Sequence, residues 1–111
     1  MNNCLFCKIV SKDLPSTVIF ENPNFLVIKD IQPLAPVHLL IITKTHIPSV
    51  DHLQESDKEL IGEMILTARQ VARDQGVAKT GYKLGFNVGR GSGQLVPHLH
   101  LHLLGGWQQN K

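Results

Sequence analysis

Three histidines alternate with leucines near the end of the chain, in the segment His98-Leu99-His100-Leu101-His102. Side chains two positions apart point to the same face of a β-strand, so a strand would place the three imidazoles on one face and the leucines in the core. A helix would distribute the same histidines around its axis, which favours the strand. Because the ordinary pKa of histidine is about 6.5, such a face is suited to nucleophilic attack and proton transfer near neutral pH.

The length of the expected strand indicates that its three histidines have different roles. At about 3.3 Å per residue the Cα atoms of His98 and His102 would lie roughly 13 Å apart. Zinc–nitrogen bonds measure only about 2 Å, so a flat strand brings the two ends to one ion only with difficulty, although His98 and His100 could share one. One end is therefore expected to serve structure or metal binding and the rest to serve chemistry. The alternative is a row of solvated histidines, where Lys, Thr and Glu would be more usual.

The chain has two cysteines, Cys4 and Cys7, both within its first seven residues. A disulfide between them would close a loop of only a few residues and would therefore stabilise the fold very little. Metal binding or redox chemistry is the expected use of the pair, and two buried thiols are the alternative.

Three glycines, Gly89, Gly91 and Gly93, precede the histidine segment. Their conformational freedom could turn backbone N–H groups outward as a nest for phosphate, with the N–H groups of residues 93 to 95 as the expected donors. The segment leads into a strand, whereas the dinucleotide-binding fingerprint opens a helix, so it is not that motif. A plain hairpin loop is the alternative.

Short β-rich runs must position these residues. Thr17–Phe20 and Phe25–Ile28 flank the turn residues Glu21–Asn24, which predicts a hairpin. Val37–Thr43 is almost wholly apolar and predicts a central strand in which His38 is buried.

One long amphipathic helix is expected before Gly76, which is suited to end it. Ser56 and Glu59 have the spacing of a capping box at its start. The strands Tyr82–Val88 and Pro97–Leu104 follow. This order of elements predicts an α+β fold, an antiparallel sheet with helices packed on one side.

Length and composition exclude several classes of protein. The 111 residues predict a single domain over 1–111, and 42% apolar with 18% charged residues disfavours disorder. A net charge of +2 is too weak and scattered for a nucleic-acid surface. No run approaches the roughly 18 apolar residues of a membrane span, and the first ten residues lack the features of a secretory signal. We therefore expect no nucleic-acid or membrane partner and a cytoplasmic location.

The chain resembles the histidine triad superfamily, whose signature of alternating histidine and apolar residues fits His98–Leu104 without exception. The resemblance covers nearly the whole chain and is closest to the Hint branch. It implies a five-stranded antiparallel sheet with one long helix and a short N-terminal helix, in a homodimer. The supporting stretches are Phe6-Cys7-Lys8-Ile9, Ile19-Phe20-Glu21, Asp30-Ile31-Gln32-Pro33, Ala35-Pro36-Val37-His38, Lys44-Thr45-His46-Ile47, Gly93-Gln94 and Leu104-Gly105-Gly106.

The resemblance implies a purine nucleoside phosphoramidase that prefers adenosine and forms a nucleotidyl-histidine intermediate. His100 matches the nucleophile, which would attack the α-phosphorus and displace an amine before water releases AMP or GMP. His102 matches the group that contacts the phosphoryl oxygens and helps to protonate the departing nitrogen. His38 matches an upstream histidine that orients the site.

The resemblance also implies a nucleotide-binding set. Asp30, followed by Ile31, matches the ribose-binding pair, and a carboxylate is suited to accept two sugar hydroxyls. Asn87, Gly93 and Gln94 match phosphate-side contacts, and Leu95 replaces a residue that often carries a hydroxyl near the leaving group. The expected base pocket comprises Phe6, Ile9, Leu14 and Ile28, any of which could equally be plain core.

A zinc site is implied by the same resemblance. Cys4 and Cys7 with His46 and His98 match a closed tetrahedral site of structural character, which would remove His98 from the chemistry. An unmetallated His98 held by hydrogen bonds is the alternative. The arrangement demands no cofactor for the reaction, since the chain has no acidic cluster suited to magnesium.

Three other functions remain open from the sequence. A dinucleoside polyphosphate hydrolase or a nucleotidyl transferase is the main rival within the same class. A nucleotide-binding regulatory module with little turnover is a different class, which Leu95 keeps open. A metal-dependent hydrolase is the third.

Overall fold

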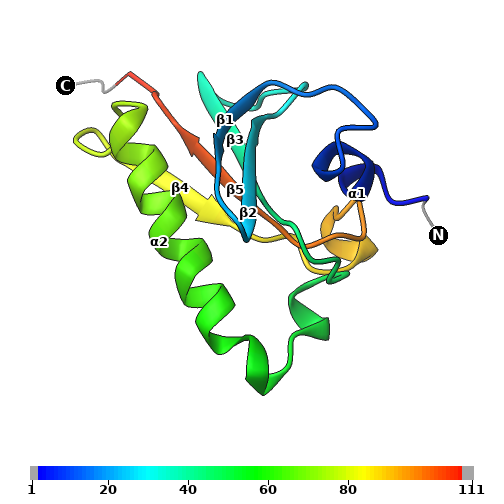
Figure 1. Cartoon of the computed structure of the whole chain (residues 1–111). Helices are drawn as coiled ribbons and strands as arrows, with labels where there is room; N and C mark the ends of the chain where they lie inside the picture. Colours follow the sequence, from blue (N-terminus) through cyan, green and yellow to red (C-terminus); the bar gives the residue numbers. More distant parts are fainter. Residues whose placement is uncertain (1–2, 109–111) are drawn as a thin grey trace.

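The computed structural model describes residues 3–108; residues 1, 2 and 109–111 of the expected domain lie outside the described residues (Figure 1). The described residues form five short strands, two helices and three single turns of 3₁₀-helix. The helices and strands are α1 (Leu5–Val10), β1 (Val18–Glu21), β2 (Phe25–Lys29), β3 (Val37–Thr43), α2 (Lys58–Asp74), β4 (Tyr82–Gly85) and β5 (His100–Gly105), and the 3₁₀ turns are Val50–His52, Glu55–Asp57 and Arg90–Ser92.

The five strands form one antiparallel sheet in the order β1-β2-β3-β5-β4, which confirms the predicted α+β fold with a central β3. The last two strands are shorter than predicted. The pairing of β4 with β5 ends where Gly85 meets His102, so Phe86 to Val88 have no partner strand. Pro97 has no N–H to donate to a ladder, and β5 begins at His100.

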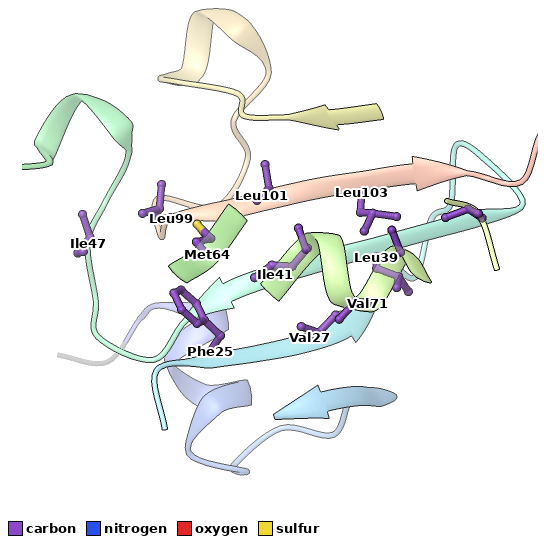
Figure 2. Close-up of a cluster of buried hydrophobic side chains, with 13 residues drawn as sticks. Phe25, Val27, Leu39, Ile41, Ile47, Met64, Val71, Leu99, Leu101 and Leu103 are labelled. Carbon is purple, nitrogen blue, oxygen red and sulfur yellow. The ribbon is translucent and has the colours of Figure 1, made fainter. Parts of the chain in front are cut away.

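Alternate side chains of the sheet enter two separate cores. On one face α2 covers the larger core, where Leu99, Leu101 and Leu103 pack with Met64 as expected (Figure 2). On the other face Phe6 and Ile9 of α1 pack on residues from β2 and β3. The prediction that the helices share one side of the sheet is therefore wrong. Each face of this sheet is apolar and needs its own cover.

The long helix begins differently from its prediction. Its N-cap is Asp57 and no side chain bonds to its free N–H groups, so the expected capping box at Ser56 and Glu59 is wrong. The reason is that Glu55–Asp57 already forms a 3₁₀ turn, whose own capping box joins Gln54 and Asp57. The expected stop is confirmed: Gly76 has a φ of +77° just beyond the helix.

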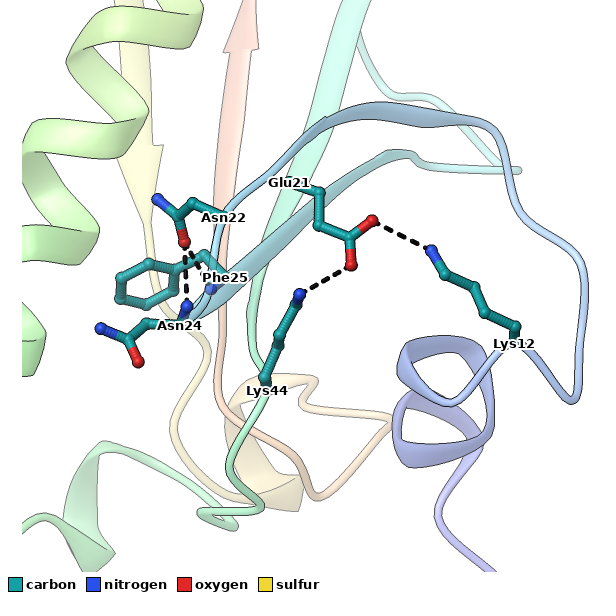
Figure 3. Close-up of polar contacts among 6 residues, drawn as sticks. All are labelled: Lys12, Glu21, Asn22, Asn24, Phe25 and Lys44. Atoms are coloured by element: carbon teal, nitrogen blue, oxygen red, sulfur yellow. Dashed lines mark hydrogen bonds and ion pairs between the residues drawn. The ribbon is translucent and has the colours of Figure 1, made fainter.

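Polar contacts fix the loops at one end of the sheet (Figure 3). Asn22 Oδ1 accepts the N–H groups of Asn24 and Phe25, which closes the predicted turn between β1 and β2. Glu21 accepts from Lys44 at 2.6 Å and Lys12 at 3.2 Å, and these two ammonium groups lower the pKa of its carboxyl. The carboxylate thus links the chain after α1 to the end of β3. Within residues 3–108 no helix has the length and apolar character needed to cross a membrane.

Candidate active site and metal centre

His100 is the first residue of β5 and lies opposite Ile42 of β3. Its side chain is buried, and its Nδ1–H donates to the backbone carbonyl of His98 at 2.6 Å. Because the proton is on Nδ1, the Nε2 atom keeps its lone pair. Burial is the main cause that lowers the pKa of His100, so the ring is neutral at neutral pH. A neutral imidazole with one nitrogen held by the backbone is a competent nucleophile.

His102 and His38 form a hydrogen-bonded pair beside this ring. The N–H of Leu34 donates to His38 Nδ1 at 3.0 Å, so the proton of neutral His38 is on Nε2. That Nε2–H faces His102 Nδ1 at 3.0 Å and the Asp30 carboxylate at 3.3 Å. Because His102 Nδ1 accepts the hydrogen bond from His38, the proton of neutral His102 is on its Nε2. The backbone thereby sets the tautomer of each histidine in turn.

Asp30, His38 and His102 also have the spacing of a metal site, since their ligand atoms lie within 4.8 Å of one another. The hydrogen bond from Leu34 argues against that use. His38 could ligate through Nε2 only if its proton moved to Nδ1, where the Leu34 N–H already donates. The three side chains therefore form a hydrogen-bonded chain.

We expect His102 to titrate near pH 4 in the folded protein, because burial, then His100 and His38, lower its pKa to about 4. Between that value and the ordinary value of about 6.5 the unfolded chain binds more protons, so the stability contributed by this group is lost as pH falls through this window. Long-range ¹H–¹⁵N NMR spectra of the histidine-labelled chain measure the midpoint, with the urea-unfolded chain as control. A folded-state midpoint near the unfolded value would contradict the expectation.

A pocket of about 510 Å³ opens beside these rings. It brings together most of the predicted site from α1, the ends of β2 and β3, the loop after β4, and β5. Leu14 and Gln94 lie outside its lining: Leu14 packs at the edge of the smaller core. The predicted residues that line it are Phe6, Ile9, Ile28, Asp30, Ile31, His38, Asn87, Gly93, Leu95, His100 and His102.

Six further residues line the pocket that the sequence reasoning missed: Leu5, Lys29, Gln32, Leu34, Leu40 and Val96. Leu40 could have been predicted from the sequence, because it lies two residues after His38 on the same strand and therefore on the same face; in the structure it pairs with His102. Leu34 had no signal in the pattern, since its role depends on its backbone N–H. Its side chain is exposed.

The glycine loop is held together from inside. Gln94 is buried; its Oε1 accepts the Gly89 N–H at 2.7 Å, and its Nε2 donates to the carbonyls of Pro48 and Val96. Gly89 and Gly93 adopt φ values of +83° and +96°. The N–H groups of Gly93 and Gln94 donate to carbonyls within the loop, so the expected outward nest over residues 93 to 95 is wrong for these two. Within residues 3–108 the N–H of Leu95 has no acceptor.

The two thiols and two other histidines converge at the start of α1. The Nδ1 of the buried His98 lies 3.2 Å from Cys4 Sγ, 3.6 Å from Cys7 Sγ and 3.2 Å from His46 Nδ1. His46 Nδ1 lies 3.3 Å from Cys7 Sγ. His98 Nε2–H donates to the Thr43 carbonyl at 2.7 Å, so its Nδ1 presents a lone pair to this cluster.

These distances fit a tetrahedral metal ion. Ligands at about 2.05 Å for nitrogen and 2.3 Å for sulfur, arranged tetrahedrally, lie about 3.3–3.8 Å from one another. The four contacts of 3.2–3.6 Å match, and all the ligand atoms lie within 4.8 Å of one another. Burial and the neighbouring Cys4 thiol raise the pKa of Cys7, as expected for two sulfurs without a cation between them. The donor set is therefore suited to hold a metal.

The chain is similar to known proteins over nearly its whole length. Residues 3–111 match the family described as "Scavenger mRNA decapping enzyme C-term binding". Protein HitA of Neisseria gonorrhoeae is 41% identical over 105 residues, which are 95% of this chain and 97% of that protein. The purine nucleoside phosphoramidase of Escherichia coli K12 is 38% identical over 102 residues, which are 92% of this chain and 86% of that protein.

Solved structures show the same relation. A HIT family hydrolase from Legionella pneumophila superposes with a TM-score of 0.94 at 48% identity, over 97% of this chain and 96% of that one. A zinc-bound histidine triad family protein from Mycobacterium smegmatis superposes with a TM-score of 0.84 at 32% identity, over 98% of this chain and 78% of that one. The chain therefore belongs to the histidine triad superfamily. Within that superfamily it is an enzyme of the hydrolase type.

Proposed function

We propose that this hydrolase cleaves the P–N bond of purine nucleoside 5′-phosphoramidates and releases AMP or GMP. The observation that carries the proposal is the tautomer of His100. Its Nδ1–H donates to the backbone carbonyl of His98, and its Nε2 keeps a lone pair on a residue that lines the pocket. The 38% sequence identity to the purine nucleoside phosphoramidase of Escherichia coli supports the choice of substrate.

The reaction proceeds in two displacements. His100 Nε2 attacks the α-phosphorus, a P–N(His) bond forms, and the P–N bond to the amine breaks. The phosphoramidate enters with its bridging nitrogen protonated from water, so this nitrogen departs as a neutral amine. The Nε2–H of the neutral His102 donates a hydrogen bond to a phosphoryl oxygen. Water then attacks the phosphorus, the P–N(His100) bond breaks, and the proton of the attacking water passes to solvent. The His38 Nε2–H holds His102 in the required orientation throughout.

The pocket offers each part of a nucleotide a suitable neighbour. Asp30 Oδ1 accepts the Gln32 N–H at 2.8 Å, which orients the carboxylate that would bind the ribose hydroxyls. Phe6 and Ile28 provide apolar walls for the base. The free N–H of Leu95, on the rim next to Gly93, is a donor for a phosphoryl oxygen.

We also propose that Cys4, Cys7, His46 and His98 hold zinc. Four protein ligands leave no position for water, so the ion would be structural and would supply no step of the reaction. The zinc-bound relative supports this assignment. Both thiols are free, in keeping with the proposed cytoplasmic location.

The proposed quaternary structure is a homodimer. Ile65 and Leu66 are exposed large apolar residues on α2. The adjacent β4 is an edge strand, which leaves one row of its backbone groups unpaired within the described residues. A second copy that covers the helix and this edge would bury both features.

Side-by-side turnover of adenosine 5′-phosphoramidate and diadenosine tetraphosphate tests the substrate class. We expect AMP from the phosphoramidate with a kcat/KM at least about tenfold higher, a difference of about 1.4 kcal/mol in transition-state binding. Mass spectrometry after an alkaline denaturing quench is expected to detect one adenylyl group on the chain. Faster cleavage of the tetraphosphate would favour the polyphosphate hydrolase, and binding without turnover would favour the regulatory module.

A further inference from the structure

Helix α1 takes part in both the metal centre and the nucleotide pocket. Cys4 is its N-cap and Cys7 lies in its first turn, and both thiols contact the imidazoles of the metal cluster. From the same helix Leu5, Phe6 and Ile9 line the pocket. A helix of six residues is not stable by itself in water. Its position therefore depends on what it packs against and on what its cysteines bind.

Phe6 connects the two sites directly. It lies between the cysteines in sequence, it is 5% exposed, and the edge-on ring contacts His98 at 5.9 Å and His100 at 5.0 Å between centroids. His98 is fully buried, and its backbone carbonyl is the acceptor for His100 Nδ1–H. The residue that offers its Nδ1 to the metal thus also sets the tautomer of the nucleophile.

We propose that metal binding at the Cys4–Cys7 cluster and nucleotide binding in the pocket are positively coupled. The inference rests on the proposed nucleotide-binding function and concerns how that site is regulated. A bound ion joins the first turn of α1 to His46 and His98, so one wall of the pocket is ordered before the nucleotide arrives. In the metal-free chain the nucleotide must order that wall as it binds, which weakens its affinity.

Thermodynamic linkage makes the coupling measurable from both sides, because each ligand must raise the affinity for the other by the same factor. Titration calorimetry measures the AMP Kd of the native chain after zinc loading and after chelator stripping. We expect zinc to lower the AMP Kd by about fivefold or more. Competition with a chromophoric chelator is expected to show zinc affinity rising by the same factor at saturating AMP. An equal AMP Kd in both forms overturns the coupling and leaves the proposed function standing, and no AMP binding to either form overturns both.

The matched control is Cys7→Ser combined with His46→Gln, which removes two ligands that lie outside the pocket lining. We expect this variant to bind AMP like the stripped native chain and to ignore added zinc, which separates the coupling from zinc–nucleotide complexes in solution. Amide hydrogen exchange of the nucleotide-free native chain is the second readout. Zinc is expected to slow exchange in residues 5–10, and unchanged exchange there would overturn the proposal even if the variant fails to fold.

Discussion

Replacement of His100 by alanine is expected to lower AMP release from adenosine 5′-phosphoramidate by about a thousandfold or more, because the variant has no group to form the covalent intermediate. The ring is buried and its Nδ1–H is held at 2.6 Å by His98, so no neighbouring histidine can take over the same attack position without moving the strand. Initial-rate assays with separated nucleotides measure the effect. Circular dichroism confirms that the variant is folded.

His52→Ala is the matched control for this experiment. His52 is an exposed histidine outside the pocket, and its ring makes a hydrogen bond to Ser49. Its turnover should stay within about twofold of the native rate, as is usual for surface positions away from the reacting groups. Free imidazole, which can occupy the space left by the deleted ring, should restore part of the activity of His100→Ala. Activity that survives the substitution would contradict the assignment of the nucleophile.

Removal of the proposed zinc ion is expected to lower the thermal midpoint of unfolding by about 10 °C or more. A ligand at about a thousand times its Kd stabilises the folded chain by about 4 kcal/mol, and a domain of this size loses about 4–8 °C per kcal/mol. Without an ion, the buried His98 presents its Nδ1 lone pair to His46 Nδ1 at 3.2 Å and to Cys4 Sγ at 3.2 Å. Differential scanning calorimetry before and after chelation, with elemental analysis of zinc per chain, measures the effect.

The double substitution Cys4→Ser and Cys7→Ser should reproduce the low midpoint and should not respond to a chelator. Ser11→Ala is the matched control, because Ser11 is exposed at the other end of the same helix and is not a ligand. We expect this control to keep its zinc and its midpoint within about 2 °C, the range of ordinary surface substitutions. A purified chain that holds no zinc and has the same midpoint with and without a chelator would contradict the proposed metal centre.

Local patterns accounted for the parts of the structure that were predicted well. The strand β3 has the predicted bounds, because an unbroken apolar run between turn residues has few alternatives. The end of α2 at Gly76 was predicted correctly because glycine adopts a positive φ with little strain, and this preference depends on the residue itself and not on distant partners. The cap of α2 was placed at Ser56, next to the true N-cap Asp57, because two overlapping capping patterns lie within residues 54–59 and the 3₁₀ turn before the helix decides between them.

The polar network was harder to predict, because its partners are backbone groups in loops. The tautomer of His38 depends on the Leu34 N–H, and the place of Gln94 depends on Gly89, Pro48 and Val96. No residue pattern encodes these contacts. The same limit explains why the N–H groups of residues 93 and 94 were expected to face outward.

The sequence alone determined which histidines share a face and which leucines enter the core, because side-chain direction in a strand alternates with every residue. It also determined that the two thiols lie three positions apart in the chain, at Cys4 and Cys7. The residue pattern alone did not show that Cys4 meets His98, which is 94 positions away and which only the family resemblance had placed beside it; the tertiary structure shows this contact. Only the tertiary structure decided that α1 covers the face opposite α2. Such contacts depend on how the whole chain crosses the sheet, and the local period of the sequence does not record that path.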